Sequence, residues 1–445
     1  MLWVDMAQRI LILGFGVEGQ SAVNFFIARD GNAQITVHDV QPESALGDIA
    51  SWRLQGVVFQ CGSDKITGDF DLCIRSPGVP VDAPILSELR ARGCPITSPT
   101  QLFFENCPSK KIVGVTGTKG KGTTSTLIFE IVRAAGLPVL LGGNIGTPML
   151  SLLPEITPDT IVILELSSFQ LMDITHSPHI AVVLMTTTDH LDIHGSEGEY
   201  IAAKSMITKF QKSEDLLIYN KDYPNSCAIA SGARGRVRAI SAREADAVVL
   251  TPTQLPGRHN LENVCAAVVV AEELGISDEI IVNALRTFRG LEHRLEFVAE
   301  YGGVCFYNDS FATNPSNALA AIRAFDKPEI LILGGSPKGS DFTELATEIA
   351  SRGTLIRAII GIGEEWVRIK EALDEAGVAK SLYIEGCISM PEIIAATKKK
   401  AHPGDVVILT PACASFGMFK NYKERGKLFK SEVLRLTELS TLYTP

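Results

Sequence analysis

Short apolar runs alternate with helix-like segments along most of the chain, and many of the runs end in glycines or polar residues. Parallel strands need a crossover between them, usually a helix, so this alternation favours parallel sheets with helices on both faces. In such folds ligands bind at the carboxyl ends of the strands. The sequence therefore predicts an α/β fold whose functional residues lie just after the strands.

The chain is long enough for more than one domain, because its 445 residues exceed one ordinary hydrophobic core. We predict a Rossmann-like unit over residues 1–107, a central mononucleotide-binding unit of the P-loop type over residues 108–290, and a second Rossmann-like unit over residues 291–445. Prolines at positions 99 and 108 mark the expected linker into the central unit.

Composition excludes several classes of partner. The net charge is −10, from 41 basic and 51 acidic residues, which argues against nucleic acid or an anionic membrane surface. Apolar runs such as Ile180–Met185 are too short to span a bilayer, and the first residues do not resemble a signal peptide. Nine cysteines without a C-x-x-C pair indicate reduced thiols. We therefore expect a cytoplasmic protein without membrane insertion, and we expect a monomer.

The first glycine loop has the pattern of a dinucleotide-binding unit. Gly14, Gly16 and Gly19 follow the apolar run Arg9–Leu13, and an acidic residue, Asp39, comes 20 positions after Gly19. This spacing predicts a Rossmann-like unit that binds a diphosphate. Two alternatives stay open: the glycines only permit close packing of helix and strand, or the chain is an NAD-dependent dehydrogenase, which leaves the second loop unexplained.

The second glycine loop, VTGTKGKGTT at residues 115–124, places glycines and Lys121 between a strand and a helix. Backbone N–H groups and an ammonium group at a helix N-terminus stabilise β- and γ-phosphate oxygens. Gly122 stands where such loops usually carry the hydroxyl that binds Mg²⁺, so Thr123 or Thr124 is expected to supply it. The alternative is an ordinary surface turn rich in glycine and lysine.

Candidate Mg²⁺ ligands follow the next two strands. Glu165 comes directly after Thr160–Leu164, and Asp189 and His190 follow Ile180–Met185. Mg²⁺ prefers hard oxygen ligands, such as the carboxylates of Glu165 and Asp189. The alternatives are a helix N-cap for Glu165, and a zinc site for His190 with His194, although no glutamate occupies the base position between these histidines.

Taken together, the motifs resemble those of the Mur ligases, ATP-dependent amide-forming enzymes of peptidoglycan precursor synthesis, and most closely the branch that adds D-glutamate. The resemblance runs from Ile10 to about Gly426. It rests on Gly117–Lys121, Gly143–Gly146, Glu165–Gln170, Asp189-His190, Ala202–Lys204, His259-Asn260 with Asn263, His293-Arg294, Asn308–Ser310 with Ala312–Asn314, Gly334-Gly335 with Lys338-Gly339, and Pro411–Ser415 with Phe419–Asn421.

The resemblance implies three domains with separate ligands. The first would bind the UDP part of UDP-N-acetylmuramoyl-L-alanine, the central one ATP and Mg²⁺, and the last D-glutamate. The residues implied for the UDP substrate are Phe15, Gly16, Val17, Asp39, Ser76, Asn144 and Ser167; those implied for glutamate are Thr313, Lys338, Ser415 and Tyr422.

The resemblance also implies the reaction: the alanyl carboxylate is activated as an acyl phosphate, and the amine of glutamate then displaces phosphate. Implied for ATP are Gly117, Thr118, Lys119, Gly120, Lys121, Gly122, Thr123, Asn260, Arg294 and Asp309, and implied for the metal are Thr123, Glu165, His190 and Lys204. Of these, Lys121, Glu165, His190 and Lys204 would be catalytic. Lys204 matches a lysine that family members carry as a carbamate. The local sequence alone predicts an ordinary solvent-exposed helix lysine at this position.

Some positions depart from the family pattern. Phe311 stands where the D-glutamate enzymes usually have lysine, and Gly417 where an aspartate is common. Gly122 is similar instead to the loop of the folylpolyglutamate synthases. A ligase of the same family for another amino acid, such as L-glutamate, a folylpolyglutamate synthase-like enzyme, and a non-catalytic nucleotide-binding module are therefore the alternatives to D-glutamate addition.

Overall fold

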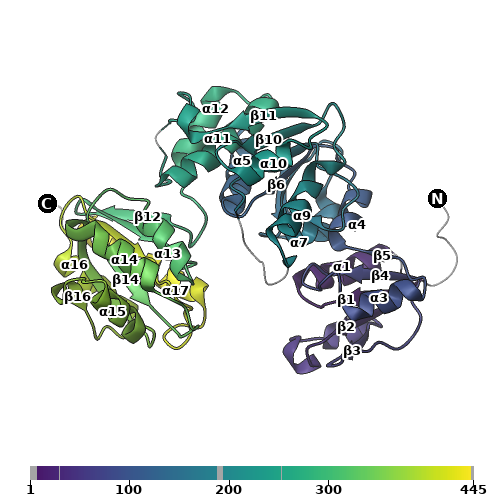
Figure 1. Cartoon of the computed structure of the whole chain (residues 1–445), viewed down its shortest axis with the longest axis horizontal. Coiled ribbons are helices and arrows are strands. Elements are labelled where there is room, and N and C mark those ends of the chain that lie inside the picture. Colours follow the sequence, from purple (N-terminus) through teal and green to yellow (C-terminus); the bar gives the residue numbers. More distant parts are fainter. Residues whose placement is uncertain (1–7, 30, 188–193, 252, 442–445) are drawn as a thin grey trace. The chain divides into compact units, whose positions relative to one another are not determined.

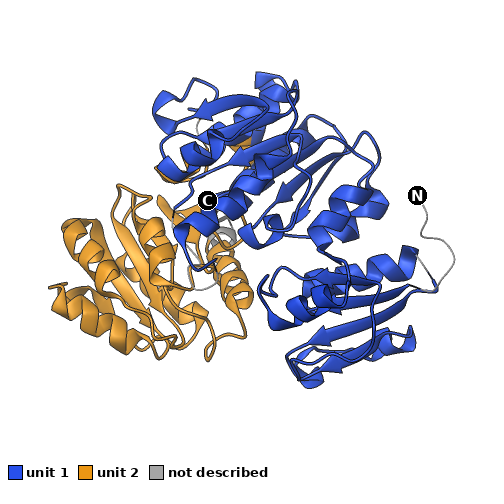
Figure 2. Cartoon of the chain, turned by 45° about the vertical axis from the view of Figure 1, so that its right-hand side comes forward, with its two compact units in different colours: residues 1–250, 262–284 blue, residues 251–261, 285–445 orange. Residues whose placement is uncertain are grey.

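The structure, a computed structural model, describes residues 8–29, 31–187, 194–251 and 253–441. The described residues form three sheets with helices between the strands (Figure 1). They pack into two units: unit 1 comprises Met1–Leu250 and Glu262–Ala284, and unit 2 comprises Thr251–Leu261 and Leu285–Pro445 (Figure 2). The predicted α/β class with three sheets is confirmed, while the predicted domain boundaries stay predictions.

Unit 1 begins with a five-stranded parallel sheet in the order β3-β2-β1-β4-β5. Its central strand, β1, is buried over Ile10–Leu13, as its apolar sequence requires. The elements are β1 (Arg9–Leu13), α1 (Val17–Arg29), β2 (Gln34–Asp39), α2 (Ala50–Leu54), β3 (Val58–Cys61), β4 (Leu72–Arg75), α3 (Pro84–Ala91), β5 (Ile96–Thr97) and α4 (Pro99–Asn106).

Unit 1 also contains a six-stranded parallel sheet in the order β11-β10-β9-β6-β8-β7. Strand β6 lies between β8 and β9, so the loop after β6 adjoins the ends of both neighbours. The elements are β6 (Ile112–Thr116), α5 (Lys121–Ala134), β7 (Val139–Gly143), α6 (Met149–Leu152), β8 (Ile161–Glu165), α7 (Ser168–Leu171), β9 (Ile180–Val183), α9 (Glu197–Lys209), β10 (Leu216–Asn220), α10 (Pro224–Ala230) and β11 (Arg236–Ile240). The helices α11 (Arg258–Glu273) and α12 (Asp278–Thr287) lie mostly in unit 1, and the first turn of α11 and the last residues of α12 belong to unit 2.

Unit 2 contains the third sheet, in the order β12-β13-β17-β14-β15-β16. All its pairs are parallel except β12 with β13, which are antiparallel neighbours. The elements are β12 (Glu296–Tyr301), β13 (Val304–Asn308), α13 (Pro315–Ile322), β14 (Glu329–Gly334), α14 (Thr343–Arg352), β15 (Ile356–Ile362), α15 (Trp366–Glu375), β16 (Tyr383–Ile384), α16 (Met390–Lys400), β17 (Val406–Leu409) and α17 (Tyr422–Thr441).

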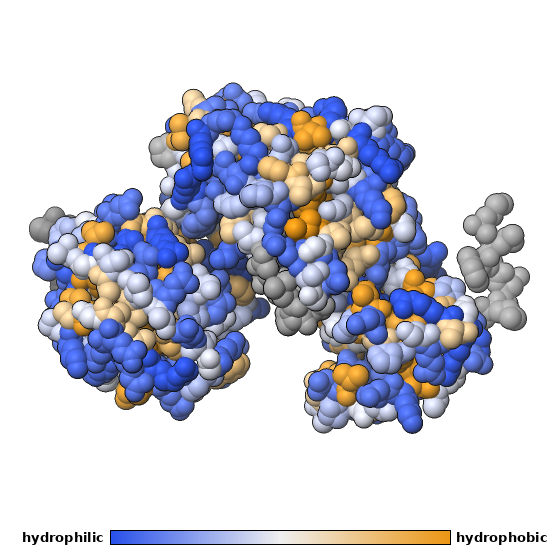
Figure 3. All heavy atoms as spheres, viewed as in Figure 1, coloured by the Kyte–Doolittle hydropathy of each residue, from blue (hydrophilic) through white to orange (hydrophobic). Residues whose placement is uncertain are grey.

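The hydrophobic cores explain how the sheets of each unit are held. In unit 1 one core is continuous from the first sheet to the second, with Ile10 and Ile12 at one end and Ala181 and Val183 at the other. In unit 2 separate cores cover the two faces of the third sheet. Hydrophilic residues dominate the face shown in Figure 3, with hydrophobic ones in small groups. No helix of the described residues is long and apolar enough to cross a membrane.

A buried acid at the start of β14 makes the stability of unit 2 depend on pH. Glu329 is fully buried and accepts a hydrogen bond from Arg352 at 2.8 Å. Burial outweighs this favourable charge and raises the pKa of Glu329 to about 8. Because the folded state then holds a proton that the unfolded state releases, the contribution of Glu329 to stability is complete below about pH 4.5 and is lost as the pH rises through 8.

We expect Glu329→Gln to flatten the pH dependence of stability between about pH 5 and pH 8, because the amide keeps the shape and cannot ionise. The measurement is thermal unfolding of the whole chain over this range. Glu344→Gln, at an exposed position of α14, is the control and should retain the slope of the wild type. Equal slopes for Glu329→Gln and the wild type would contradict the assignment.

Candidate active site

The phosphate-type loop connects β6 to α5, as the sequence predicts. Two of its glycines adopt backbone angles that other residues rarely take: φ is 151° at Gly117 and 89° at Gly120. A Cβ atom added to Gly120 would lie 2.3 Å from Oδ1 of Asn263, and one added to Gly117 would lie 2.9 Å from Cβ of Leu184. Both glycines are therefore required by packing as well as by conformation.

Two lysines converge on the same carbonyl of this loop. Nζ of Lys121 donates to the Gly117 oxygen at 3.0 Å, and Nζ of Lys204 donates to it at 2.9 Å. Lys204 is only 1% exposed and also lies over the ring of Tyr200, 4.7 Å from its centroid. The Tyr200 hydroxyl contacts Oγ1 of Thr118 at 3.0 Å, so helix α9 supports the loop from one side.

The structure places Glu165 beside this loop. Glu165 is the last residue of β8, not the first after it, and it pairs in register with Val115 of β6. Its buried carboxylate accepts a hydrogen bond from Nδ2 of Asn144 at 2.8 Å, and the Asn144 backbone N–H donates to the Glu165 carbonyl. The two predicted residues Asn144 and Glu165 therefore form one polar pair.

Only some of the predicted metal ligands lie among the residues that the structure describes. His190 and Asp189 lie outside the described residues. Within the described ranges no three His, Cys, Asp or Glu side chains gather as a metal site would require. A site here would thus depend on Glu165, on the Thr123 hydroxyl, on modification of Lys204 and on His190, and this set stays a prediction.

The two threonines of the loop differ in their surroundings. Thr124 is fully buried and its Oγ1 donates to Oδ1 of Asn263 at 3.2 Å. Thr123, one residue earlier in the first turn of α5, is half-buried. The hydroxyl of Thr124 is therefore used in packing α5 against α11, which leaves Thr123 as the residue suited to a ligand.

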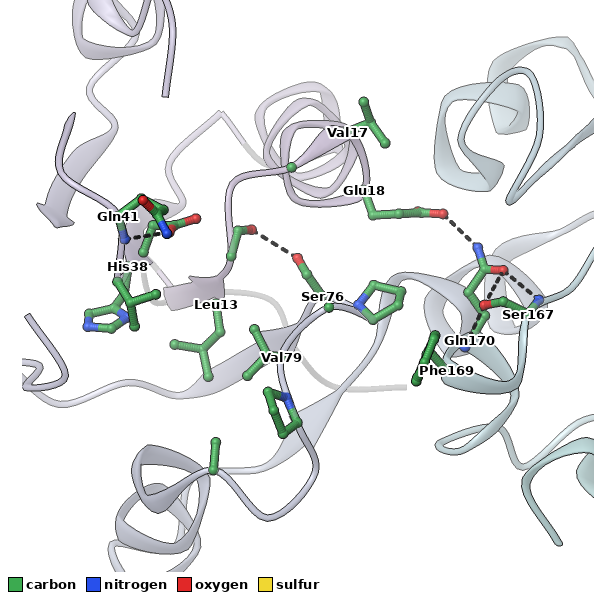
Figure 4. A pocket seen from close by; sticks show the side chains of 18 of the residues that line it. Leu13, Val17, Glu18, His38, Gln41, Ser76, Val79, Ser167, Phe169 and Gln170 are labelled. Atoms are coloured by element: carbon green, nitrogen blue, oxygen red, sulfur yellow. Dashed lines mark hydrogen bonds between the residues drawn. The ribbon is translucent and has the colours of Figure 1, made fainter. Parts of the chain in front are cut away.

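A cavity of about 640 Å³ lies between the two sheets of unit 1 (Figure 4). Its walls include the first glycine loop, the ends of β2 and β4, and the segments after β7 and β8. Of the predicted substrate residues, it is lined by Gly16, Val17, Asp39, Ser76, Asn144 and Ser167. An added Cβ at Gly16 would meet no atom within 4 Å, whereas one at Gly19 would lie 2.0 Å from the Gly14 oxygen.

Phe15, also predicted for the substrate, is not among the residues that line this cavity. Its ring is buried against Trp52 and Phe59. Its backbone N–H donates to the carboxylate of Asp39 at 2.8 Å, and the same carboxylate accepts from Gln41. Asp39 therefore fixes the glycine loop through the backbone of Phe15, whose carbonyl oxygen also accepts from Nε2 of Gln20 at 3.2 Å.

Glu18 and Gln170 also line the cavity, and the sequence does not predict either as a site residue. Figure 4 shows Glu18 extending from α1 to Gln170, whose Nε2 donates to the Glu18 carboxylate at 2.8 Å. Gln170 also accepts from Ser167 in a capping box at the start of α7. Burial raises the pKa of Glu18. The signals were available: Glu18 lies in the first helical turn after the glycines, and Gln170 ends the motif at Glu165.

In unit 2 the polar segments after β13 and β17 meet at one edge of the sheet, the edge formed by the carboxyl ends of its parallel strands. Asp309 is buried, accepts from the Leu295 backbone and from Oγ1 of Thr410, and has its pKa raised by burial to about 7. Arg425, also fully buried, donates to Ser310 and to the carbonyl oxygens of Cys413 and Ala414.

The residues predicted for glutamate lie in segments that follow strands of the third sheet or begin α17. Ser415 is buried after β17, Lys338 is exposed after β14, and Thr313 is half-buried. Tyr422 begins α17, and its carbonyl accepts from Ser310 at 2.8 Å. Asn260 is buried in α11, and its side chain donates to the Pro256 oxygen at 2.7 Å. Their roles in binding stay predictions.

Comparison with known proteins identifies the family. The MurD-like N-terminal domain of Mur ligases matches residues 8–98, the Mur ligase middle domain residues 115–251, and the Mur ligase, glutamate ligase domain residues 293–413. The chain is 37% identical to a curated protein of Pelotomaculum thermopropionicum, covering 96% of the chain and 98% of the relative. The chain belongs to the Mur ligase family.

Further relatives agree with this assignment. The Pelotomaculum protein is named UDP-N-acetylmuramoylalanine–D-glutamate ligase, as are relatives from Clostridium kluyveri, 36% identical, and Acidobacterium capsulatum, 39% identical, each matched over 96% of both chains. Among solved structures, this Mur ligase is similar to MurF from Acinetobacter baumannii, with a TM-score of 0.59 and 18% identity over 96% of this chain and 93% of that one. It is also similar to MurF from Thermotoga maritima in complex with ADP, with a TM-score of 0.58 and 16% identity over 97% and 99%. These structures establish the fold alone.

We expect Gly16→Ala to weaken ligand binding and Gly19→Ala to lower the stability of the fold. The methyl group of Gly16→Ala meets no protein atom but lies in the cavity wall where a diphosphate would approach the backbone, so UDP should bind about tenfold more weakly at unchanged stability. Gly19→Ala forces α1 away from β1 and should lower stability by about 1–3 kcal/mol. Calorimetric binding of UDP and thermal unfolding check this, and weaker UDP binding only in Gly19→Ala would contradict it.

We expect Thr123→Val to reduce the use of Mg·ATP without changing the unfolding temperature, because Thr123 is half-buried at the start of α5. Thr124→Val should instead lower the unfolding temperature, since it leaves the buried amide of Asn263 without the Thr124 hydroxyl. KM for ATP at several Mg²⁺ concentrations, measured beside thermal unfolding, separates the two. The reverse order of effects would mean that Thr124 is the ligand.

Proposed function

We propose that this chain is an ATP-dependent ligase that joins D-glutamate to the alanyl carboxylate of UDP-N-acetylmuramoyl-L-alanine in the synthesis of peptidoglycan precursors. The observation that carries the proposal is the 36–39% identity, over 96% of the chain, to relatives named for this activity. The cavity at the first glycine loop and the phosphate-type loop after β6 support it independently.

The cavity of unit 1 suits the nucleotide-sugar substrate. Its volume is that of an ordinary small-molecule site, and its floor is a glycine loop at the N-terminus of the 13-residue helix α1. Backbone N–H groups there would bind the diphosphate, with Asp39 and Ser76 holding the loop in place. Asn144 and Ser167, at the other wall, would bind the sugar and alanyl end.

The loop after β6 suits the phosphates of ATP. Gly120, in the left-handed conformation, is the N-cap residue of the 14-residue helix α5, and the N–H groups at a helix N-terminus suit an anion. Lys121 is held at the Gly117 carbonyl and would contact the transferred phosphoryl group. Mg²⁺, when bound, supplies positive charge that stabilises the charge developing on the phosphoryl oxygens. Glu165, oriented by Asn144, and Thr123 would hold it together with His190 and a carbamate on Lys204.

The reaction then needs two positioned groups. The alanyl carboxylate attacks the γ-phosphate and ADP leaves, which gives an acyl phosphate. The amine of D-glutamate attacks the acyl carbon, the C–O bond to phosphate breaks, and the amine loses a proton. In unit 2 the two carboxylates of glutamate would be bound by Thr313, Lys338, Ser415 and Tyr422, while Asn260, Arg294 and Asp309 would bind ATP.

We also propose that the protein acts in the cytoplasm as a monomer. All nine cysteines are free thiols in the structure, which supports a reducing compartment. The proposed substrates, ATP and a UDP-sugar, support the same location.

The proposal is tested by offering the purified protein ATP, Mg²⁺, UDP-N-acetylmuramoyl-L-alanine and each amino acid in turn, with release of phosphate as the readout. D-Glutamate should give the fastest release, and the product should be the amide. Preference for L-glutamate or D-aspartate would replace the amino-acid assignment, and release without any UDP-sugar would remove the ligase assignment.

We expect Glu165→Gln to reduce kcat by about 10²-fold or more while the unfolding temperature stays within a few degrees of the wild type, because the amide keeps the hydrogen-bonded shape and removes the charge. Glu155→Gln, an acid outside the site, is the control. A kcat near that of the wild type would remove Glu165 from the mechanism.

A further inference from the structure

Arg294 is held in an unusual way at the edge of the third sheet. Its guanidinium carbon lies 4.0 Å from the ring centroid of Phe311, the shortest such contact among the described residues. Arg294 is exposed, and within residues 253–441 no carboxylate forms an ion pair with it. A ring fixes the plane of a guanidinium and leaves its N–H donors for a ligand, whereas a carboxylate would occupy them.

The backbone that carries Arg294 is strained on both sides. His293 has φ of 67° and Leu295 has φ of 46°, values in the left-handed region that side chains other than glycine rarely adopt. Such residues persist only where surrounding contacts hold them, and they gather at functional sites. Here the Phe311 N–H donates to the His293 carbonyl at 2.9 Å, and the Leu295 N–H donates to Asp309 at 3.0 Å.

Phe311 is itself in contact with a second aromatic ring. Its ring meets that of Tyr422 edge to face at 5.1 Å, and the Tyr422 ring meets His293 in the same manner at 5.9 Å. The aromatic rings and the strained turn therefore form one assembly, and the guanidinium of Arg294 is its exposed member. The usual lysine at position 311 would remove the ring and place a second cation beside Arg294.

We propose that Phe311 is a positioning residue whose ring fixes the Arg294 guanidinium so that its N–H donors bind a phosphate group of the adenine nucleotide. This inference rests on the proposed function, because it takes the nucleotide as the ligand. It accounts for the loss of the family lysine without a change of substrate: the charge is supplied by Arg294, and the ring orients it.

The test measures binding of ADP and of adenosine by calorimetry, so that it does not depend on turnover. Phe311→Leu keeps apolar volume and removes the ring, and it should weaken ADP binding about threefold to thirtyfold while adenosine binding is unchanged. Phe311→Tyr keeps the ring and should restore ADP binding. Phe311→Lys should bind ADP less well than Phe311→Leu, because its ammonium displaces Arg294.

A double-mutant cycle separates positioning from structure. Phe311→Leu should have no further effect on ADP binding when Arg294 is already replaced by alanine, since the ring acts through the guanidinium. The control is Tyr301→Leu, which removes the ring under Lys398 at another edge of unit 2 and should leave ADP binding unchanged.

The outcomes distinguish failure of this inference from failure of the proposed function. If the wild type binds ADP and Phe311→Leu binds it equally, or if Phe311→Leu weakens ADP equally with and without Arg294, the inference is wrong and the proposed function stands. If Phe311→Lys improves ADP binding, position 311 acts through charge and the inference is likewise wrong. A wild type that binds neither ADP nor UDP removes the proposed function and the inference together.

Discussion

The carbonyl oxygen of Gly117 is the point on which the centre of unit 1 depends. Two ammonium groups, those of Lys121 and Lys204, donate to it at 3.0 and 2.9 Å and so lie within about 6 Å of each other. Like charges this close, one of them fully buried, favour any neighbour that brings negative charge. A phosphate bound at Lys121 would bring such a charge, and a carbamate on Lys204 would convert one cation into an anion. The geometry of the loop thus explains why a phosphate and a modified lysine would suit the same place.

Sequence predicts most of this fold because the strands of parallel sheets are continuous apolar runs. The runs at Arg9–Leu13 and Ile180–Met185 correspond to β1 and β9, with an end shifted by two residues in the second. Strand β12 is different: Glu296–Tyr301 is a partly exposed edge strand that returns through Gly302 and Gly303, and its mixed composition gives no continuous run. Its register could not be predicted from local pattern.

The site is less predictable than the fold, for a physical reason. The glycine loops and Glu165 are visible in the sequence because their spacing and chemistry are local. The contacts of Glu18 with Gln170 and of Asn263 with Thr124 are not visible, because each joins residues about 140 or more positions apart. The Arg294–Phe311 pair is intermediate: both residues lie in motifs that can be read, but only the structure shows that one is stacked on the other.

The partners of the cations distinguish those that stabilise the fold from those that would bind ligands. Arg75 and Arg357 are paired with the carboxylates of Asp173 and Asp405, and each pair joins separate elements. Arg294 contacts the aromatic ring of Phe311 instead, and no carboxylate of residues 253–441 forms an ion pair with it. A neutral partner orients a cation without neutralising it, so its charge stays available to an anion. At Arg294 a chain with a net charge of −10 thus keeps a local positive charge, because the ring holds the cation without cancelling it.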